Sequence, residues 1–471
     1  MTRRVLLIAA LGASACGDSG SSGARATRPP RGILFVTIES LRADHVSGLG
    51  YGRATTPRLD ELAAGATLYP QASSTTSWTL TSHASLFTGL YPGAHRVIEP
   101  RDRLVDGATT FAELLRDRGW QTAGLVSGPY LCRPFGLDQG FESWDDSLSP
   151  DFDRIDEAPT NPAVEAAILH FLDAPPGAPR DASRPFLLFA YLWDPHYSYL
   201  PPSPFDARFV PPNAVRFDLR HFDTNERIRA TMPQGELDYL ISQYDGEIGA
   251  TDAMLGRVFD ALRAKGLWDE MAIVVTADHG EEFFDHGQKG HKRNLYAESL
   301  HVPLWIKEPG QRAARRDERV VNGVDLFPTL LELAGVEYDG PCHGRSLLEP
   351  ADDARATFHE LTTTWYFTQP DGRVKRSDVW SSVRRGDRQL FTIDFFDGRH
   401  EERLYDVAHD PQQKSKLGAD VDASDLKQLF SDFHRDTERL GEQLEGSGPT
   451  SLTPEEEARL RAAGYLDDGK R

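Results

Sequence analysis

Four polar residues in this sequence combine the types that bind a divalent cation and supply a nucleophile. Glu39 follows one apolar run of the chain, and Asp278 and His279 follow another. Carboxylate oxygens and an imidazole nitrogen are suitable ligands for a divalent ion. Thr79 opens a segment with helical spacing, and coordination to such an ion lowers the pKa of a hydroxyl, which makes it nucleophilic. This combination predicts a metal-assisted transfer of an ester group.

Three further histidines offer contacts for the oxygens of a tetrahedral sulfate or phosphate. They are His83, His196 and His291. The helix that begins near Thr79 adds backbone N–H groups, which point out of a helix N-terminus and attract anions. We therefore predict an anion site beside the cation site.

Each of these residues also has a plainer structural interpretation. Ser77, Thr79 and Thr81 can cap the helix that starts near them, and Glu39 can cap a helix that follows it. The Asp-His pair can be a turn after a strand, and His196 can be a packed loop histidine. Three acids of the chain are interpreted as surface or packing groups: Asp245, Glu247 and Asp252.

The residues that carry this chemistry lie at the ends of segments that predict buried strands. Four short apolar runs lack a polar face, which is typical of parallel strands covered on both sides. These runs are 33–38, 122–128, 186–193 and 272–277. Helical patterns alternate with them, the longest at 235–265. The alternation predicts an α/β fold with a central, mostly parallel sheet, and ligands bind outside the carboxyl ends of such strands.

After about residue 355 the pattern changes to extended stretches separated by turns, followed by a helical stretch at 423–441. This change predicts a small antiparallel sheet and a terminal helix. We place the main α/β unit at 32–350 and a C-terminal subdomain with terminal helices at 351–471.

Composition limits the classes of partner. The chain has 471 residues, with 52 Lys+Arg against 72 Asp+Glu, which gives a net charge of −20. An acidic protein lacks the positive field that binds nucleic acid, so we expect no nucleic-acid partner. An anionic substrate then requires a local source of positive charge, most simply a metal ion. Three cysteines exclude a disulfide scaffold or a four-thiolate zinc site, and Cys132 and Cys342 are either paired or free.

The N-terminal residues have the pattern of an export signal. Residues 1–16 combine two arginines, a short apolar run and small residues before Cys16, and the run is too short to span a bilayer. Cys16 stands where bacterial lipoproteins carry their lipidated cysteine. Residues 17–31 are rich in Gly, Ser, Arg and Pro and predict a flexible tether. We expect an exported periplasmic or cell-surface protein that contacts a membrane only through a lipid on Cys16.

Several blocks of sequence occur in the order found in one family. They are VTIESLRADHVSGLGYGRATTPRLDELAAGA, SHASLFTGLYP, DPHYSYLPP, VVTADHGEEFFDHGQKGH, HGRSLLEP and LYDVAHDP. Together they span about residues 32–415, and they resemble the sulfatase family of the alkaline phosphatase superfamily. The resemblance implies an α/β sandwich with a smaller C-terminal sheet, and a metal-dependent ester hydrolase.

The chain departs from the sulfatase pattern at the residues that define its chemistry. The family signature is Cys-x-Pro-Ser-Arg, whose cysteine is matured to formylglycine. Here Thr79 occupies the cysteine position and His83 occupies the arginine position. Glu39 stands alone where many sulfatases have paired aspartates, and His279 replaces an asparagine. This set is similar to that of relatives with a threonine nucleophile, which act on phosphodiesters.

The resemblance implies one divalent ion held by Glu39, Thr79, Asp278 and His279, with Thr79 as the nucleophile. Mn²⁺ or Zn²⁺ is favoured because imidazole suits these metals, and Ca²⁺ or Mg²⁺ remains open.

The remaining site residues follow the family motifs. His196 and His291 are expected at the substrate oxygens, and His83 and Arg42 are weaker candidates. The substrate is expected to be an anionic ester, a phosphodiester or phosphonate ahead of a sulfate ester, on a glycan or a lipid head group. The alternatives are a sulfatase proper and a catalytically silent metal-binding surface lipoprotein.

Overall fold

The computed structural model describes residues 29–149, 159–174, 180–352, 354–369, 372–445 and 451–462. The predicted export signal, Cys16 and the tether up to residue 28 lie outside these ranges. Arg31 already belongs to the folded body, since its backbone N–H donates to the Glu270 carbonyl at 2.8 Å. Within the described ranges no helix is both long and apolar enough to cross a membrane.

Eight strands form the central sheet, in the order β11-β2-β10-β7-β1-β6-β4-β5. The strands are β1 (Gly32–Ile38), β2 (Thr67–Leu68), β4 (Gln121–Val126), β5 (Ser143–Asp145), β6 (Phe186–Leu192), β7 (Met271–Ala277), β10 (Leu304–Lys307) and β11 (Arg315–Arg316). Only β10 runs antiparallel to its neighbours β7 and β2, and the other pairs are parallel. The predicted α/β fold with a mostly parallel sheet is confirmed.

The register of the three central strands brings their carboxyl ends level. Ile38 of β1 pairs with Leu192 of β6 on one side and with Ala277 of β7 on the other. All residues of these strands are buried, because helices cover both faces of the sheet. The polar residues that follow β1 and β7 therefore leave the sheet at the same height, next to each other.

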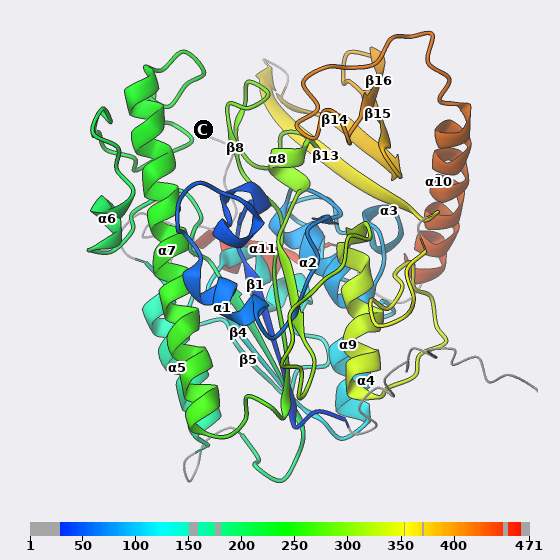
Figure 1. The fold of residues 1–471 in the computed structure, drawn as a ribbon. Coiled ribbons are helices and arrows are strands. Elements are labelled where there is room, and N and C mark those ends of the chain that lie inside the picture. Colours follow the sequence, from blue (N-terminus) through cyan, green and yellow to red (C-terminus); the bar gives the residue numbers. More distant parts are fainter. Residues whose placement is uncertain are drawn as a thin grey trace, which may run out of the picture.

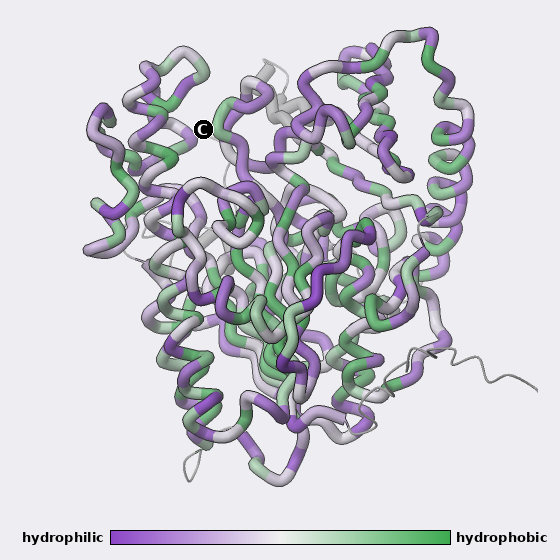
Figure 2. Tube along the Cα trace, in the orientation of Figure 1, coloured by the Kyte–Doolittle hydropathy of each residue, from purple (hydrophilic) through white to green (hydrophobic). Residues whose placement is uncertain are grey.

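Helices pack on both faces of the sheet (Figure 1). On one face lie α1, α5 and α7, and on the other α2, α4 and α9. Their bounds are α1 (Pro57–Ala63), α2 (Thr79–Thr88), α4 (Phe111–Asp117), α5 (Asn161–Asp173), α7 (Gln234–Ala264) and α9 (Leu326–Ala334). The sheet and the inner faces of these helices form the apolar interior, which is the green centre of Figure 2.

The long helix α7 agrees with the prediction at 235–265, and its acids are packing partners. Asp245, Glu247 and Asp252 are all buried. Asp252 accepts hydrogen bonds from the backbone N–H groups of Arg58 and Leu59, which fixes the start of α1 against α7. These three acids thus hold loops in place against α7.

A second sheet follows the main unit, as predicted. It is antiparallel, in the order β13 (Ala356–Gln369), β14 (Gly372–Arg385), β15 (Arg388–Asp394) and β16 (His400–Asp406). Helix α10 (Ser424–Glu445) packs against β14 and α3 (Pro92–His95), and α11 (Pro454–Ala462) follows it. Other short elements are β3 (Ala72–Ser73) paired with β12 (Val321–Asn322), β8 (Glu282–Phe283) paired with β9 (Lys289–Gly290), α6 (Phe205–Arg208) and α8 (Ala297–Leu300).

The structure settles the alternative left open for two cysteines. Cys132 is buried and Cys342 is half-buried, and the two are not paired with each other. Cys342 lies against Gly89, where a left-handed backbone with φ of 69° ends helix α2.

Candidate active site

The sheet and helix α2 bring the four predicted residues of the cation site together. Glu39 is the first residue after β1, Asp278 and His279 are the first two after β7, and Thr79 is the first residue of α2. All four side chains are buried. One ligand atom each from Glu39, Asp278 and His279 lie within 4.8 Å of one another.

The Thr79 hydroxyl faces this cluster directly. Its Oγ1 donates to the Glu39 carboxylate, at 3.3 Å from Oε2 and 3.4 Å from Oε1, and lies 3.3 Å from His279 Nε2. His279 Nδ1 bonds the Gly280 carbonyl at 2.8 Å, which directs Nε2 toward Thr79 and Glu39. The hydroxyl is thus surrounded by the groups that would have to activate it.

Asp278 carries the clearest sign that the cluster fits a cation. Its Oδ1 accepts from the backbone N–H groups of Ser40 and His279, at 3.0 and 2.9 Å. Its Oδ2 is buried and accepts no hydrogen bond from the described residues, although His279 Nε2 lies 3.5 Å away. A buried carboxylate oxygen without a hydrogen bond is energetically costly, and a bound cation would satisfy it.

The electrostatics of the cluster also favour added positive charge. Burial and the adjacent Glu39 carboxylate raise the pKa of Asp278 well above its usual value. Burial alone would lower the pKa of His279, but Asp278 and Glu39 outweigh it and raise that pKa to about 10. Burial likewise opposes ionisation of Glu39, yet the neighbouring histidines, His279 foremost, hold its pKa well below the usual value. Two carboxylates so close together attract a cation.

The capping interpretation does not describe the start of α2. The N-cap residue is Trp78, and no side chain caps the helix. Ser77 Oγ donates instead to the Asn294 carbonyl at 2.8 Å, and Thr81 Oγ1 is buried without a partner in the described part of the chain. Thr79 is therefore positioned by the helix and is not used to stabilise it.

His83 lies behind Thr79, one turn along α2. Its Nδ1 bonds the Thr79 carbonyl at 2.8 Å, and its Nε2 bonds Thr37 Oγ1 at 2.9 Å. Burial lowers the pKa of this ring to about 4, so it is neutral. Because both ring nitrogens already bond protein atoms, this geometry favours a positioning role over the predicted contact with substrate.

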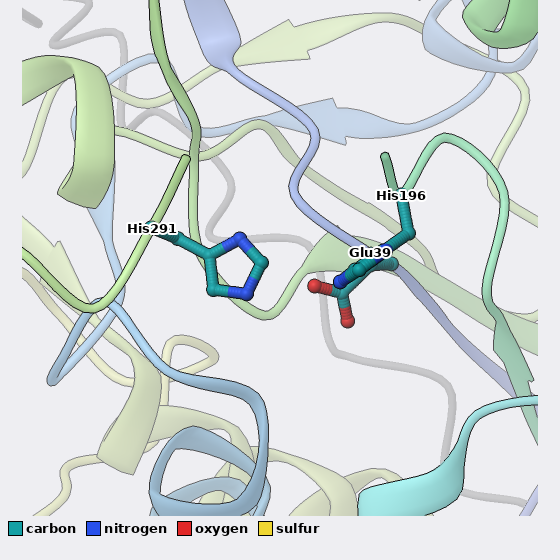
Figure 3. A group of neighbouring side chains, drawn as sticks. All are labelled: Glu39, His196 and His291. Carbon is teal, nitrogen blue, oxygen red and sulfur yellow. The ribbon is translucent and has the colours of Figure 1, made fainter. Parts of the chain in front are cut away.

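His196 and His291 lie close to the Glu39 carboxylate, and Figure 3 shows these three side chains. His196 follows β6 and stacks on Trp193, with ring centroids 3.8 Å apart. His291 follows β9 and its ring centroid lies 4.5 Å from that of His279. Burial lowers the pKa of His196 to about 4 and that of His291 to about 3, so both rings are neutral.

Two other polar residues near the motifs have structural partners. Arg42 forms ion pairs with Asp44 and Asp285, each at 2.8 Å. His286 bonds Glu298 at 2.7 Å and stacks on Tyr296. Arg42 therefore anchors loops behind the site. We assign it this supporting role in place of the direct contact that the sequence suggested.

Sequence reasoning missed three residues that support the cluster. Tyr191 O–H donates to Glu39 Oε2, and Tyr199 O–H donates to Glu281 Oε2 at 2.8 Å. Glu281 in turn accepts from His291 Nδ1 at 3.1 Å, and burial raises the pKa of its carboxyl to about 7. Tyr191 lies in an apolar strand run, where the sequence offers no sign of a polar role. Glu281 follows Asp278 by three residues, and that proximity was the available signal.

Comparison with known proteins assigns this arrangement to a family. Residues 31–336 match the sulfatase family, and residues 283–442 match the C-terminal region described for N-sulphoglucosamine sulphohydrolase. The chain belongs to the sulfatase family. The α/β sandwich with a smaller antiparallel sheet is thus the sulfatase fold, and the chain is an ester-hydrolysing enzyme of that family.

Individual relatives carry different names. The multifunctional alkaline phosphatase superfamily protein PehA of Trinickia caryophylli is 25% identical, over 83% of this chain and 91% of its own length. An N-acetylglucosamine-6-O-sulfatase of Bacteroides thetaiotaomicron is 23% identical, over 88% of this chain and 86% of its own. The crystal structure of a phosphonate monoester hydrolase of Agrobacterium radiobacter superposes with a TM-score of 0.67 at 21% identity, covering 88% of this chain and 96% of that one.

Proposed function

We propose that this protein is a divalent-cation-dependent hydrolase that uses Thr79 to cleave phosphodiesters or phosphonate monoesters. The observation that carries the proposal is the position of Thr79 Oγ1, 3.3 Å from both Glu39 Oε2 and His279 Nε2 at the carboxyl edge of the sheet. A threonine cannot become formylglycine, so release of the product has to occur by attack at the central atom. The likeness in fold to a phosphonate monoester hydrolase is consistent with the same ester class.

The residues act in two displacements. Thr79 Oγ1 attacks phosphorus and its proton passes to Glu39, the carboxylate it faces. The new Oγ1–P bond forms as the P–O bond to the alcohol breaks, and the alcohol leaves with a proton taken from solvent water. Water then attacks phosphorus and gives up a proton to solvent, the Oγ1–P bond breaks, and Thr79 regains its proton from Glu39. His83 holds the carbonyl of Thr79 throughout, and His196 and His291 border the space for the ester's other oxygens.

Glu39, Thr79, Asp278 and His279 are the residues that would hold the cation. When bound, it supplies positive charge that stabilises the negative charge developing on the ester oxygens. The donor set of two carboxylates, a hydroxyl and an imidazole favours Mn²⁺ or Zn²⁺ over Ca²⁺ or Mg²⁺. The protein has a net charge of −20, which repels an anionic substrate. The cation would supply the local positive charge that such a substrate needs in order to bind.

Sulfate esters are the second candidate substrate class. The observations that favour them are the relative named N-acetylglucosamine-6-O-sulfatase and the match of residues 283–442 to a sulphohydrolase region. Both concern sulfated sugars, so under this alternative the alcohol part of the substrate is a glycan. We further infer that the protein is exported and attached to a membrane through Cys16, and that it works on glycans or lipid head groups in the periplasm or at the cell surface.

The proposal is tested with purified protein and four chromogenic esters: an aryl phosphonate monoester, a phosphate diester, a phosphate monoester and a sulfate monoester. Each is assayed with added Mn²⁺, Zn²⁺, Mg²⁺ or Ca²⁺. We expect the phosphonate and the diester to be cleaved fastest, with Mn²⁺ or Zn²⁺. Faster cleavage of the sulfate would support the second candidate, and no turnover of any ester by a cation-loaded protein would indicate a silent binding protein.

The nucleophile is tested by Thr79→Ala, which should lower kcat at least about a thousandfold, equivalent to about 4 kcal/mol of transition-state stabilisation. Thr81→Val is the matched control, since Thr81 lies on the same helix and its buried hydroxyl has no partner in the described structure. The control should keep its activity. Full turnover by the Thr79 variant would refute the assignment.

A further inference from the structure

A cavity outside the active site lies between the main α/β unit and the C-terminal sheet. Its walls come from residues 70–73, from the segment 295–301 around α8, from strands β13, β14 and β15, and from the loop 407–413. It has a volume of about 170 Å³. About 10–15 Å³ is enough for one water molecule, so a polyatomic ligand fits. Exposed Pro411 is part of the wall, which opens the cavity to solvent.

The charge of the wall is positive. Among the described residues that line the cavity, none is acidic, although the chain has 72 Asp+Glu. Half-buried Arg384 is the charged residue of the wall, since burial lowers the pKa of His301 and brings that of His359 to about 3, which leaves both rings neutral. Arg384 forms no ion pair within the described ranges, and Asp387 only partly offsets the effect of burial on its pKa. A cation withdrawn from water without a counter-ion attracts an anion.

The hydrogen bonds of Arg384 orient the guanidinium and leave one of its nitrogens available. Nη2 donates to Gln71 Oε1 at 2.7 Å, and Nε donates to the Gly386 carbonyl at 3.1 Å. Both acceptors are neutral, so they do not balance the charge. Nη1 has no hydrogen-bond partner among the described residues. An oxyanion in the cavity would supply the charge-assisted hydrogen bond that Nη1 lacks.

His301 offers the opposite function, a hydrogen-bond acceptor. Its Nε2 lies 2.8 Å from the Pro70 carbonyl. A carbonyl oxygen only accepts hydrogen bonds, so Nε2 carries the proton and the neutral ring presents a lone pair at Nδ1. Nδ1 has no hydrogen-bond partner in the described part of the chain. A ligand that satisfies both Arg384 and His301 is therefore an oxyanion that also has a proton to donate.

Other polar groups in the wall are already bonded to each other or to neighbouring side chains. His359 bonds Ser382 Oγ through Nδ1 at 2.9 Å and Ser73 Oγ through Nε2 at 3.2 Å. Gln413 Nε2 donates to Gln389 Oε1 at 2.7 Å. These bonds fix the shape of the cavity before a ligand enters, which lowers the entropic cost of binding.

The segment 295–301 separates the cavity from the active site. Its other side pairs with the residues that follow Asp278 and His279. The Gly280 N–H donates to the Ser299 carbonyl at 2.8 Å, and the Glu281 N–H donates to the Glu298 carbonyl at 2.9 Å. A ligand in the cavity would thus lie behind this segment, without contact to the cation cluster.

We propose that the cavity binds a small phosphate, either free hydrogen phosphate or a monoalkyl phosphate, through Arg384 and His301. The charged oxygens accept from Arg384 Nη1, and the P–O–H group donates to His301 Nδ1. The apolar part of the wall, with Leu295, Leu300 and Val407, would contact the alkyl group of a monoester. Sulfate has no proton to donate and is the poorer ligand. The site does not depend on the proposed function, because its residues lie outside the cation cluster.

The test is isothermal titration calorimetry at about pH 6, near the second pKa of a phosphate monoester. The Asp278→Asn chain is used, so that phosphate bound to an active-site cation does not contribute. We expect one inorganic phosphate or one methyl phosphate per chain, and sulfate bound at least about tenfold more weakly. Adding Arg384→Gln should weaken phosphate binding at least about tenfold, because it removes a charged donor. Arg385→Gln is the matched control, since Arg385 is exposed and follows on β14, and it should leave binding unchanged.

The outcomes identify the occupant or overturn the site. Tighter binding of methyl phosphate supports a monoester seated against the apolar wall, and tighter binding of inorganic phosphate supports the free ion. No binding of either, or binding that Arg384→Gln and Arg385→Gln alter equally, would overturn the proposal. Sulfate bound as tightly as phosphate would overturn the hydrogen bond to His301. Thermal unfolding of each variant verifies that it is folded, and a negative result here leaves the proposed function standing.

Discussion

Two buried clusters of this protein join a carboxylate to a histidine, and they differ in how fully the carboxylate is bonded. Asp245 on α7 accepts from His45 Nδ1 at 2.7 Å, from Tyr51 O–H at 2.8 Å and from Arg53 Nη1 at 2.5 Å. Asp278 at the sheet edge is equally buried, yet its Oδ2 has no hydrogen-bond partner in the described ranges. We call a cluster saturated when every carboxylate oxygen accepts a hydrogen bond, as at Asp245, and unsaturated when one oxygen accepts none, as at Asp278. A saturated cluster stabilises the fold, whereas an unsaturated one can bind a ligand.

The largest expected effect is a loss of activity on substitution in the Asp278 cluster. Asp278→Asn should lower kcat/KM at least about a thousandfold, about 4 kcal/mol, because it removes a cation ligand. The same variant, freed of cation, should be no less stable than the wild type, since one of two adjacent buried carboxylates is gone. Activity assays and thermal unfolding of the same samples check both parts. Near-normal turnover would show that Asp278 is not a ligand.

The next largest effect is on stability and lies at the other cluster. Asp245→Asn should lower the free energy of unfolding by about 3 kcal/mol, because it leaves buried donors with a weaker partner. At a temperature where the variant is folded, its activity should stay within a few fold of the wild type. Denaturant unfolding and kcat measure these quantities. A stable variant would mean that the hydrogen bonds of this cluster add little.

The sequence predicted one cluster and not the role of the other, for physical reasons. Glu39, Asp278 and His279 follow apolar strands, and parallel strands must bring their carboxyl ends to one edge. Asp245 lies on a long helix, where an acid is usually at the surface, and its burial depends on loop residues nearly 200 positions away. Tyr191 was hidden in a strand for the same reason, since only the folded sheet places its hydroxyl at Glu39.

A cation should stabilise the protein through one cluster only. At about 100 times its Kd, Mn²⁺ should raise the free energy of unfolding by about 2.7 kcal/mol relative to protein treated with a chelator. The increase should vanish in Asp278→Asn and persist in Asp245→Asn. Thermal unfolding with and without Mn²⁺ measures it. An equal increase in both variants would place the binding elsewhere.

The smallest effect tests a positioning residue at the edge of the unsaturated cluster. Glu281→Gln removes the carboxylate that orients His291 and should lower kcat/KM by about 10- to 100-fold. Binding of Mn²⁺ should be unaffected, so metal titration and steady-state kinetics of the same variant separate the two properties. Unchanged kinetics would show that Glu281 acts only in packing.

The central claim is that Thr79 is the nucleophile of a cation-dependent ester hydrolase. The most direct test is a crystal structure of the Mn²⁺-loaded protein with vanadate, which mimics phosphorus under attack. The account predicts vanadium bonded to Thr79 Oγ1, with Glu39, Asp278 and His279 around the adjacent cation. Vanadate bonded to water or to another side chain, with Thr79 turned away, would contradict it.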